Sequence, residues 1–195
     1  TDVIEKALGC HKDRVLALSG PSFANEVGAG KPTMVMLGGT RPIANSLKKL
    51  LETDRFFIKV TTDKKGIQLL GFYKNVLAIL MGLCEGLELG NNFKSALIAR
   101  AYSEFYYLNT HKGEVRKHSF IDFAGLGDLY ATATYHTSRN RRCGFLLAKG
   151  KSESEIKKEI GQVIEGYENL LMLKEIKDKS HIDENLVNLL LDIVR

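Results

Sequence analysis

The feature that most constrains the fold is an apolar stretch at residues 66–90, GIQLLGFYKNVLAILMGLCEGLELG. Apolar residues occupy almost every face of it over about five helical turns, which is typical of a helix enclosed by protein. Lys74 and Asn75 lie in its middle. A lysine is rarely fully buried without a partner, because burial disfavours its charged form. Lys74 is therefore either a surface residue whose alkyl stem covers apolar neighbours or the centre of a polar site.

The composition is that of a globular chain, with 44% apolar and 26% charged residues among 195, enough for one domain or parts of two. The sequence holds no run of about 18 uncharged apolar residues and no leader pattern, so we expect a cytoplasmic location and no membrane partner. The three cysteines are far apart and the five histidines lack metal-binding spacing. We therefore expect neither a disulfide framework nor a metal site.

The hydrophobic pattern changes near residue 62. Before it, a helix-like piece at residues 2–9 (DVIEKALG) leads into strand-type runs at residues 15–18, 33–37 and 56–60. A helix at residues 41–52, with Pro42 in its first turn, lies between the second and third of these runs. The order strand, strand, helix, strand is typical of an α/β domain. After it, apolar periodicity predicts helices alone, at residues 66–90, 92–110, 127–134, 139–149, 152–160, 163–176 and 184–194. We therefore expect an α/β part at residues 1–62 and an all-helical domain at residues 63–195.

Four polar stretches stand out against this background: residues 19–27 (SGPSFANEV), 74–75 (KN), 125–140 (GLGDLYATATYHTSRN) and 161–166 (GQVIEG). Each alone has a structural explanation, because glycines and Pro21 suit a strand-to-helix turn, and Asp128 and Ser138 suit helix caps. Glycines around Pro21 would also let a ligand approach the backbone closely. The segments GLGDLY and GAGKPT lack the spacing of nucleotide-binding loops.

The segment SRNRR at residues 138–142 is the sharpest local signal. Ser138 suits the N-cap of a helix beginning at Arg139, and a helix N-terminus beside a guanidinium is suited to bind phosphate. The same segment begins a series of basic residues that extends to Lys158. We count Glu153 and Glu155 as the only acidic residues that oppose this series locally. This patch leaves open a second class of function, a non-catalytic helical domain that binds phosphate or nucleic acid.

Taken together, the chain resembles the soluble NAD(P)-dependent sn-glycerol-3-phosphate dehydrogenases in five segments that occur in the family's order, SGPSFANEV, KNVLAILMGLCEGLELGNNFKSALI, FAGLGDL, SRNRR and QVIEG. The resemblance implies the remnant of a Rossmann domain followed by an all-helical substrate domain. It implies an oxidoreductase that interconverts dihydroxyacetone phosphate and sn-glycerol 3-phosphate with NAD or NADP. It also implies a supply of sn-glycerol 3-phosphate to glycerophospholipid synthesis.

The resemblance assigns roles to single residues. Lys74 falls on the catalytic lysine, which exchanges a proton with the C2 oxygen of the substrate. The implied substrate-binding residues are Gly20, Ser22, Lys74, Asp128, Ser138, Arg139 and Asn140. The implied cofactor-binding residues are Ala24, Arg139, Val163 and Glu165. The chemistry agrees, because an ammonium stabilises the negative charge that hydride transfer builds on a carbonyl oxygen, while an arginine holds the phosphate.

The glycine-rich dinucleotide loop of the family, which normally binds the pyrophosphate, does not occur in this sequence. We therefore expect the 195-residue chain alone to bind NAD(P)H weakly and to turn over little. The choice between NAD and NADP stays open. So does a related hydroxy-acid dehydrogenase, although SRNRR favours a phosphate-bearing small molecule. The apolar helices leave room for a homodimer surface, and under the leading interpretation we expect no nucleic-acid partner.

Overall fold

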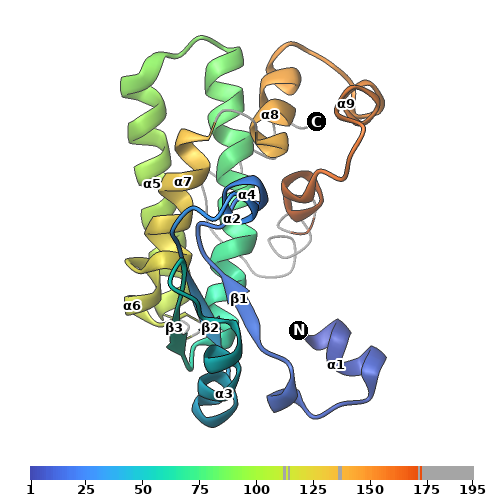
Figure 1. The fold of residues 1–195 in the computed structure, drawn as a ribbon. Coiled ribbons are helices and arrows are strands. Elements are labelled where there is room, and N and C mark those ends of the chain that lie inside the picture. Colours follow the sequence, from blue (N-terminus) through green and yellow to red (C-terminus); the bar gives the residue numbers. More distant parts are fainter. Residues whose placement is uncertain (112, 114, 136–137, 171, 173–195) are drawn as a thin grey trace. The chain divides into compact units, whose positions relative to one another are not determined.

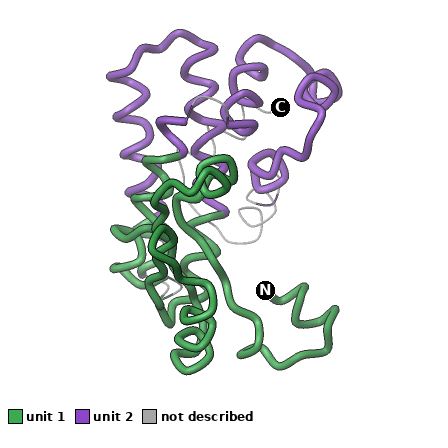
Figure 2. The backbone as a smooth tube through the Cα atoms, in the orientation of Figure 1, with its two compact units in different colours: residues 1–71, 106–131 green, residues 72–105, 132–195 purple. Residues whose placement is uncertain are grey.

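The structure is a computed structural model that describes residues 1–111, 113, 115–135, 138–170 and 172. It divides into two compact units, coloured separately in Figure 2. Unit 1 comprises residues 1–71 and 106–131, and unit 2 comprises residues 72–105 and the described part of 132–195. The domain boundary expected near residue 62 stays a prediction.

Unit 1 holds a three-stranded sheet in the order β1-β2-β3, with β2 antiparallel to β1 and parallel to β3. The elements up to the end of the sheet, labelled in Figure 1, are α1 (Asp2–Leu8), a 3-10 turn (Lys12–Arg14), β1 (Ala17–Ser19), α2 (Ala24–Gly28), β2 (Thr33–Gly38), α3 (Arg41–Leu51) and β3 (Phe56–Thr61). The expected order of strand, strand, helix and strand is confirmed. The 3-10 turn and α2 were not expected, because three and five residues are too short to show periodicity.

Alternation along β2 gives the sheet an apolar core on each face. Val35 and Leu37 pack with Ala44 of α3 and Ile58 of β3. Met36, which points the other way along the pleat, packs in a separate cluster with Ala17, Ile67 and Ala124. Helical segments therefore cover both faces of the sheet, as in an α/β fold.

The chain after the sheet is helical in the described residues, as expected. Its elements are α4 (Lys64–Gly86), α5 (Gly90–His111), α6 (Lys117–Phe120), a π-helical turn (Phe123–Gly127), α7 (Asp128–Thr134), α8 (Arg139–Ala148) and α9 (Glu153–Ile160), and residues 165–170 are also helical. At α9 the expected capping box of Ser152 with Glu155 is present, and Gly161 ends the helix with φ 66°. The helix expected at 184–194 lies outside the described residues.

The expected end of the central helix at residue 90 is wrong, because α4 ends at Gly86. Glu88 adopts the left-handed conformation with φ 58°. Its N–H donates to the carbonyl of Glu85 at 3.1 Å, and the N–H of Leu89 donates to that of Cys84 at 3.0 Å. These two bonds form a Schellman motif, in which the left-handed position is usually glycine. The stop was missed because a glutamate occupies that position.

Helix α4 is enclosed as its sequence predicts. Its buried residues include Ile67, Val76, Leu77, Ile79 and Leu80. Among the described residues it is the one helix long and apolar enough to cross a bilayer, with mean hydropathy 1.6 over 18 residues. However, 67% of that window is buried inside the protein, which is also the pattern of a core helix.

In unit 2, α8 crosses α4 at backbone contact. A Cβ added at Gly82 would overlap the carbonyl oxygen of Arg141, and one added at Gly144 would overlap the carbonyl oxygen of Ile79. One added at Gly86 would overlap the Cβ of Ala148. Glycines on both helices therefore let the two backbones approach more closely than side chains would allow.

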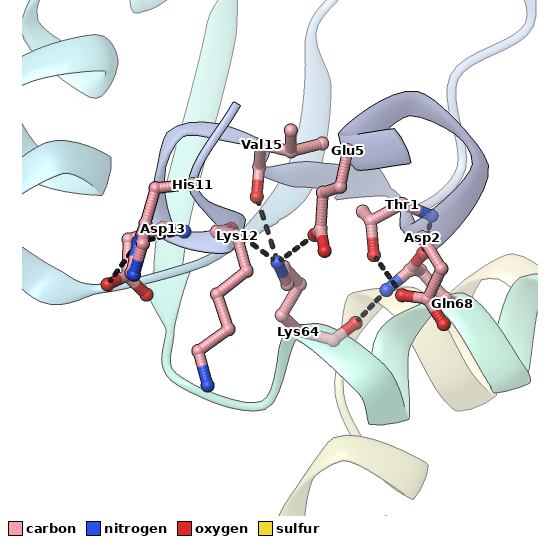
Figure 3. A network of polar contacts seen from close by, with 9 residues as sticks. All are labelled: Thr1, Asp2, Glu5, His11, Lys12, Asp13, Val15, Lys64 and Gln68. Carbon is pink, nitrogen blue, oxygen red and sulfur yellow. Dashed lines mark hydrogen bonds and ion pairs between the residues drawn. The ribbon is translucent and has the colours of Figure 1, made fainter. Parts of the chain in front are cut away.

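In unit 1, a polar network holds α1 against the start of α4 (Figure 3). The Lys64 ammonium donates to Glu5 Oε1 at 3.0 Å, to the carbonyl of Lys12 at 2.8 Å and to the carbonyl of Val15 at 3.1 Å. The N-terminal amine of Thr1 donates to Gln68 Oε1 at 2.9 Å. Because α1 has no buried residue, these polar contacts attach it to the rest of unit 1.

Replacement of Glu88 by glycine is expected to stabilise the protein by about 1 kcal/mol, because glycine lacks the Cβ that opposes the left-handed conformation. The 3.9 Å contact of Glu88 with Lys149 is exposed and contributes little. Urea denaturation would measure the gain. Glu88→Ala is the matched control, since it removes the carboxylate and keeps the Cβ. An equal gain in both variants would contradict the backbone explanation.

Candidate active site

Unit 2 contains six of the residues that the resemblance singles out, and the structure relates several of them directly. Lys74 and Asn75 are half-buried in the middle of α4. The preceding residue, Tyr73, is buried and stacks on Phe105 of α5, with ring centroids 3.4 Å apart. Lys74 therefore lies on a helix that packs against α5 at the adjacent residue.

Three segments of unit 2 meet beside this point. Asn75 Nδ2 donates to Glu165 Oε2 at 3.1 Å, and the N–H of Gly166 donates to Asn140 Oδ1 at 2.9 Å. A Cβ on Gly166 would lie 2.5 Å from the carbonyl oxygen of Asn75 and 2.9 Å from Asn140 Oδ1. The chain neighbour of Lys74 therefore lies together with Asn140 and Glu165, two residues to which the family resemblance also assigns roles.

The start of α8 separates the three arginines of SRNRR. Ser138 caps the helix as expected, its Oγ accepting from the N–H of Arg141 at 3.5 Å. Arg142 pairs with Glu159 at 3.1 Å, and Arg141 is buried. Arg139 is exposed and has no ion pair among the described residues. Of the three guanidiniums, that of Arg139 is the one available to an external anion.

The buried guanidinium of Arg141 is held from two sides. Its Nε donates to Glu85 Oε2 at 2.7 Å, its Nη2 donates to Glu85 Oε1, and its Nη1 donates to the carbonyl of Ala133 at 3.2 Å. Lys94 also donates to Glu85 Oε1, at 2.8 Å. Burial acts to raise the pKa of the Glu85 carboxyl, but hydrogen bonds from Arg141 and Lys94 outweigh it and the pKa lies below its usual value. Glu85 is therefore a carboxylate shared by two cations.

Neighbouring carboxylates pair with much of the basic run that follows. Lys151 pairs with Glu159, which also binds Arg142, and Lys157 pairs with Glu153 at 2.5 Å. The count of opposing charges from the sequence was incomplete, because it left out Glu159. Paired side chains present less positive charge to a polyanion, so the patch gives weaker support to nucleic-acid binding than its sequence did.

Unit 1 contains the other four residues. Gly20 is buried with φ 142°, and a Cβ there would lie 3.0 Å from the Cα of Val35. The Ser22 hydroxyl is exposed and donates to the carbonyl of Gly20 at 3.0 Å, and Ala24 is the exposed first residue of α2. The loop is thus a tight turn, as its structural explanation required, that also presents an exposed hydroxyl.

The same loop lies beside the segment that leads into α7. The ring of Pro21 is 3.9 Å from the position that a Cβ on Gly127 would occupy. Asp128, the next residue, is the first of α7 and is 3% exposed. Unit 1 therefore brings the SGPS loop and the Asp128 segment together, although they are over 100 residues apart in the sequence.

Val163, the remaining candidate cofactor-binding residue, belongs to unit 2 and is 70% exposed.

Sequence reasoning missed the Glu85, Lys94 and Arg141 group. Their separation in the chain gives no local signal, since Glu85 and Arg141 are 56 positions apart. The crossing of α4 by α8 did leave a sequence signal, the small residues Gly82 and Gly86 one helical turn apart.

Known proteins resemble this chain over most of its length. The family model described as NAD-dependent glycerol-3-phosphate dehydrogenase C-terminus matches residues 63–195, and the model of the corresponding N-terminus matches residues 1–45. A glycerol-3-phosphate dehydrogenase (NAD(P)+) of Carboxydothermus hydrogenoformans is 39% identical over 84% of this chain and 49% of its own length. One of Dechloromonas aromatica is 46% identical over 77% and 46%, respectively.

A solved structure gives the same result for the fold. The crystal structure of glycerol-3-phosphate dehydrogenase from Coxiella burnetii superposes with a TM-score of 0.88 at 36% identity, covering 100% of this chain and 59% of its own. The chain spans about half the length of the curated relatives it matches. The family resemblance seen in the sequence, and the expected fold class, are confirmed.

Replacement of Glu85 by glutamine is expected to destabilise the protein near pH 7 and to lose this effect in acid. The folded pKa of Glu85 lies below the unfolded value of 4.5, so the carboxylate stabilises the fold above that value and loses its contribution as pH falls through the folded pKa. Urea unfolding at pH 7 and at pH 3.5, each for the unsubstituted and the substituted chain, would measure the difference. A stability gap that did not shrink at pH 3.5 would contradict the role given to the carboxylate.

Proposed function

Because the chain belongs to the NAD-dependent glycerol-3-phosphate dehydrogenase family, we propose that it carries the substrate-binding and proton-transfer part of an oxidoreductase that interconverts dihydroxyacetone phosphate and sn-glycerol 3-phosphate. NAD or NADP would supply or take up the hydride when bound. A phosphorylated small molecule is the substrate class that the family implies.

The observation that carries the proposal is the state of the three arginines at the start of α8. Arg141 and Arg142 are paired with carboxylates within unit 2, while Arg139 is exposed at a helix N-terminus capped by Ser138. Such an N-terminus has unpaired N–H groups and a partial positive charge, which favour a phosphate. Arg139 adds a planar donor that can bind two phosphate oxygens. This arrangement suits one phosphate monoester better than a long polyanion.

Lys74 supports the second half of the proposal. Its place on an enclosed helix, beside a stacked Tyr73, limits the positions its ammonium can take. When a hydride reaches a ketone carbon, negative charge grows on the oxygen, and an ammonium near that oxygen both stabilises the charge and donates a proton. In the reverse direction the neutral amine accepts the proton of the C2 hydroxyl. Binding of the phosphate at Arg139 would supply the energy that places the carbonyl.

The neighbouring polar residues have positioning tasks in this scheme. Asn75 is oriented by Glu165, and Asn140 is oriented by the N–H of Gly166. We assign substrate contacts to Gly20, Ser22, Asp128, Ser138 and Asn140 with Lys74 and Arg139. In unit 1, the exposed Ser22 hydroxyl and the carboxyl of Asp128 are groups that suit a polyol phosphate.

We assign cofactor contacts to Ala24, Arg139, Val163 and Glu165. These residues fit one part of a dinucleotide, since Val163 and Ala24 expose apolar surface and Arg139 exposes a charge. The glycine-rich loop that binds the pyrophosphate does not occur in the sequence. These four residues would therefore contribute to, and not complete, the binding of NAD or NADP.

Several wider roles belong to the same proposal. The product, sn-glycerol 3-phosphate, would enter glycerophospholipid synthesis in the cytoplasm. Residues 1–62 would be the closing part of the dinucleotide-binding domain and residues 63–195 the substrate domain. A homodimer surface would form from exposed apolar residues of the helices, without a nucleic-acid or membrane partner.

Calorimetric titration of the 195-residue chain would test the phosphate site. sn-Glycerol 3-phosphate is expected to bind more tightly than glycerol, and Arg139→Gln is expected to weaken its binding about tenfold or more by removing a charge-assisted contact. Arg142→Gln is the matched control, because Arg142 already pairs with Glu159. Equal binding of both ligands would contradict the proposal. Tight binding of an oligonucleotide with a steep salt dependence would favour the nucleic-acid alternative instead.

Replacement of Lys74 by methionine would test the proton-transfer role. The measurement requires a complete dinucleotide site. A hybrid in which the N-terminal part of the Dechloromonas aromatica relative precedes this chain would provide one. The kcat for dihydroxyacetone phosphate reduction is expected to fall by about 10² to 10⁴, the usual contribution of a general acid. Turnover close to that of the unsubstituted hybrid would exclude Lys74 as the proton donor.

A further inference from the structure

Arg141 is the most unusual charged residue of unit 2. It is 8% exposed, although it lies in the first turn of a helix, where charged side chains normally face water. Glu85 of α4 accepts two of its hydrogen bonds and Ala133 of α7 accepts a third. A guanidinium held by a bidentate carboxylate and a carbonyl is fixed in both position and plane.

Helix geometry links this burial to the exposure of Arg139. Successive residues of an α-helix are about 100° apart, so side chains two positions apart point about 200° apart, to nearly opposite faces. Holding Arg141 inward therefore turns Arg139 outward. Arg142 lies near the face of Arg139, about 60° away by the same geometry, but Glu159 binds it.

Packing of α8 against α4 does not require this ion pair. Cys143, Gly144 and Leu146 are buried on α8, and the glycine crossing already brings the two backbones into contact. A buried ion pair gives little net stability over well-packed apolar residues, because desolvation opposes the attraction. The hydrogen bonds of the Arg141 guanidinium instead fix the rotation of the first turn of α8 about the helix axis.

We propose that Arg141 is a positioning residue, clamped by Glu85 so that the first turn of α8 presents Arg139 to a phosphate ester. The proposal rests on the function proposed above. Lys94 takes part by sharing Glu85, which stays ionised between two cations. Arg141 itself would touch neither substrate nor cofactor.

Binding of sn-glycerol 3-phosphate to the 195-residue chain tests the proposal. Arg141→Met, which keeps length and loses the fork, is expected to weaken binding about tenfold, as the loss of an aligned charge-assisted contact would. Arg141→Lys is expected to recover part of the loss, because one contact to Glu85 can re-form. Arg142→Met is the matched control, the adjacent arginine with an exposed partner, and its binding is expected within about twofold of the unsubstituted chain.

A double variant separates positioning from general damage. The double variant Glu85→Gln with Arg141→Met is expected to bind sn-glycerol 3-phosphate no more weakly than Arg141→Met alone, because both changes break the same ion pair. Additive losses would overturn the proposal. Circular dichroism of each variant would confirm that the helices are retained before binding is compared.

Amide hydrogen exchange gives a readout that needs no ligand. The N–H of Arg142 donates to the carbonyl of Ser138 at 2.9 Å and closes the first turn of α8. Its exchange is expected to accelerate about tenfold in Arg141→Met while the amides of α9 are unchanged. Unchanged exchange at Arg142 would overturn the positioning role, whether or not the chain binds a phosphate ester. Absence of phosphate-ester binding by the unsubstituted chain would instead refute the proposed function. Equal binding by Arg141→Met and the unsubstituted chain would overturn the positioning role alone.

Discussion

The contact between the backbones of α4 and α8 is the constraint on which the rest of unit 2 depends. Gly82, Gly86 and Gly144 remove the side chains that would hold these helices apart. Once the backbones touch, Glu85 on α4 comes within reach of Arg141 on α8. The candidate anion site is thus a consequence of helix packing, and the charges adjust within limits that the packing sets.

Charge neutralisation then decides which basic side chains can act. A cation that already has a carboxylate partner gains less from an incoming anion, because it must give up one contact to form another. In the basic run from Arg139, acidic partners from α4 and α9 bind Arg141, Arg142, Lys151 and Lys157. The resulting site is defined as much by the carboxylates that neutralise its neighbours as by Arg139 itself.

Much of the fold could be read from the sequence, because periodicity and capping residues report local structure. The enclosed helix around Lys74, the cap at Ser138 and the capping box of α9 were all visible there. The end of α4 was not, since Glu88 occupies a backbone conformation that usually requires glycine. Nor was the burial of Arg141, which depends on a partner distant in the chain. The assigned roles of Lys74 and the other candidate residues stay predictions, because a side-chain position alone does not report chemistry.

The glycine crossing also limits how unit 2 can move. At ordinary helix interfaces, side chains change rotamer and allow one helix to shift along another. Here carbonyl oxygens face bare Cα atoms, so a slide of α8 by one turn would put the side chain of Asn140 or Ala148 where Gly144 now lies against the backbone of α4. The close backbone packing therefore opposes sliding of the two helices past each other. A closure around a ligand in this unit would then involve segments outside the crossing.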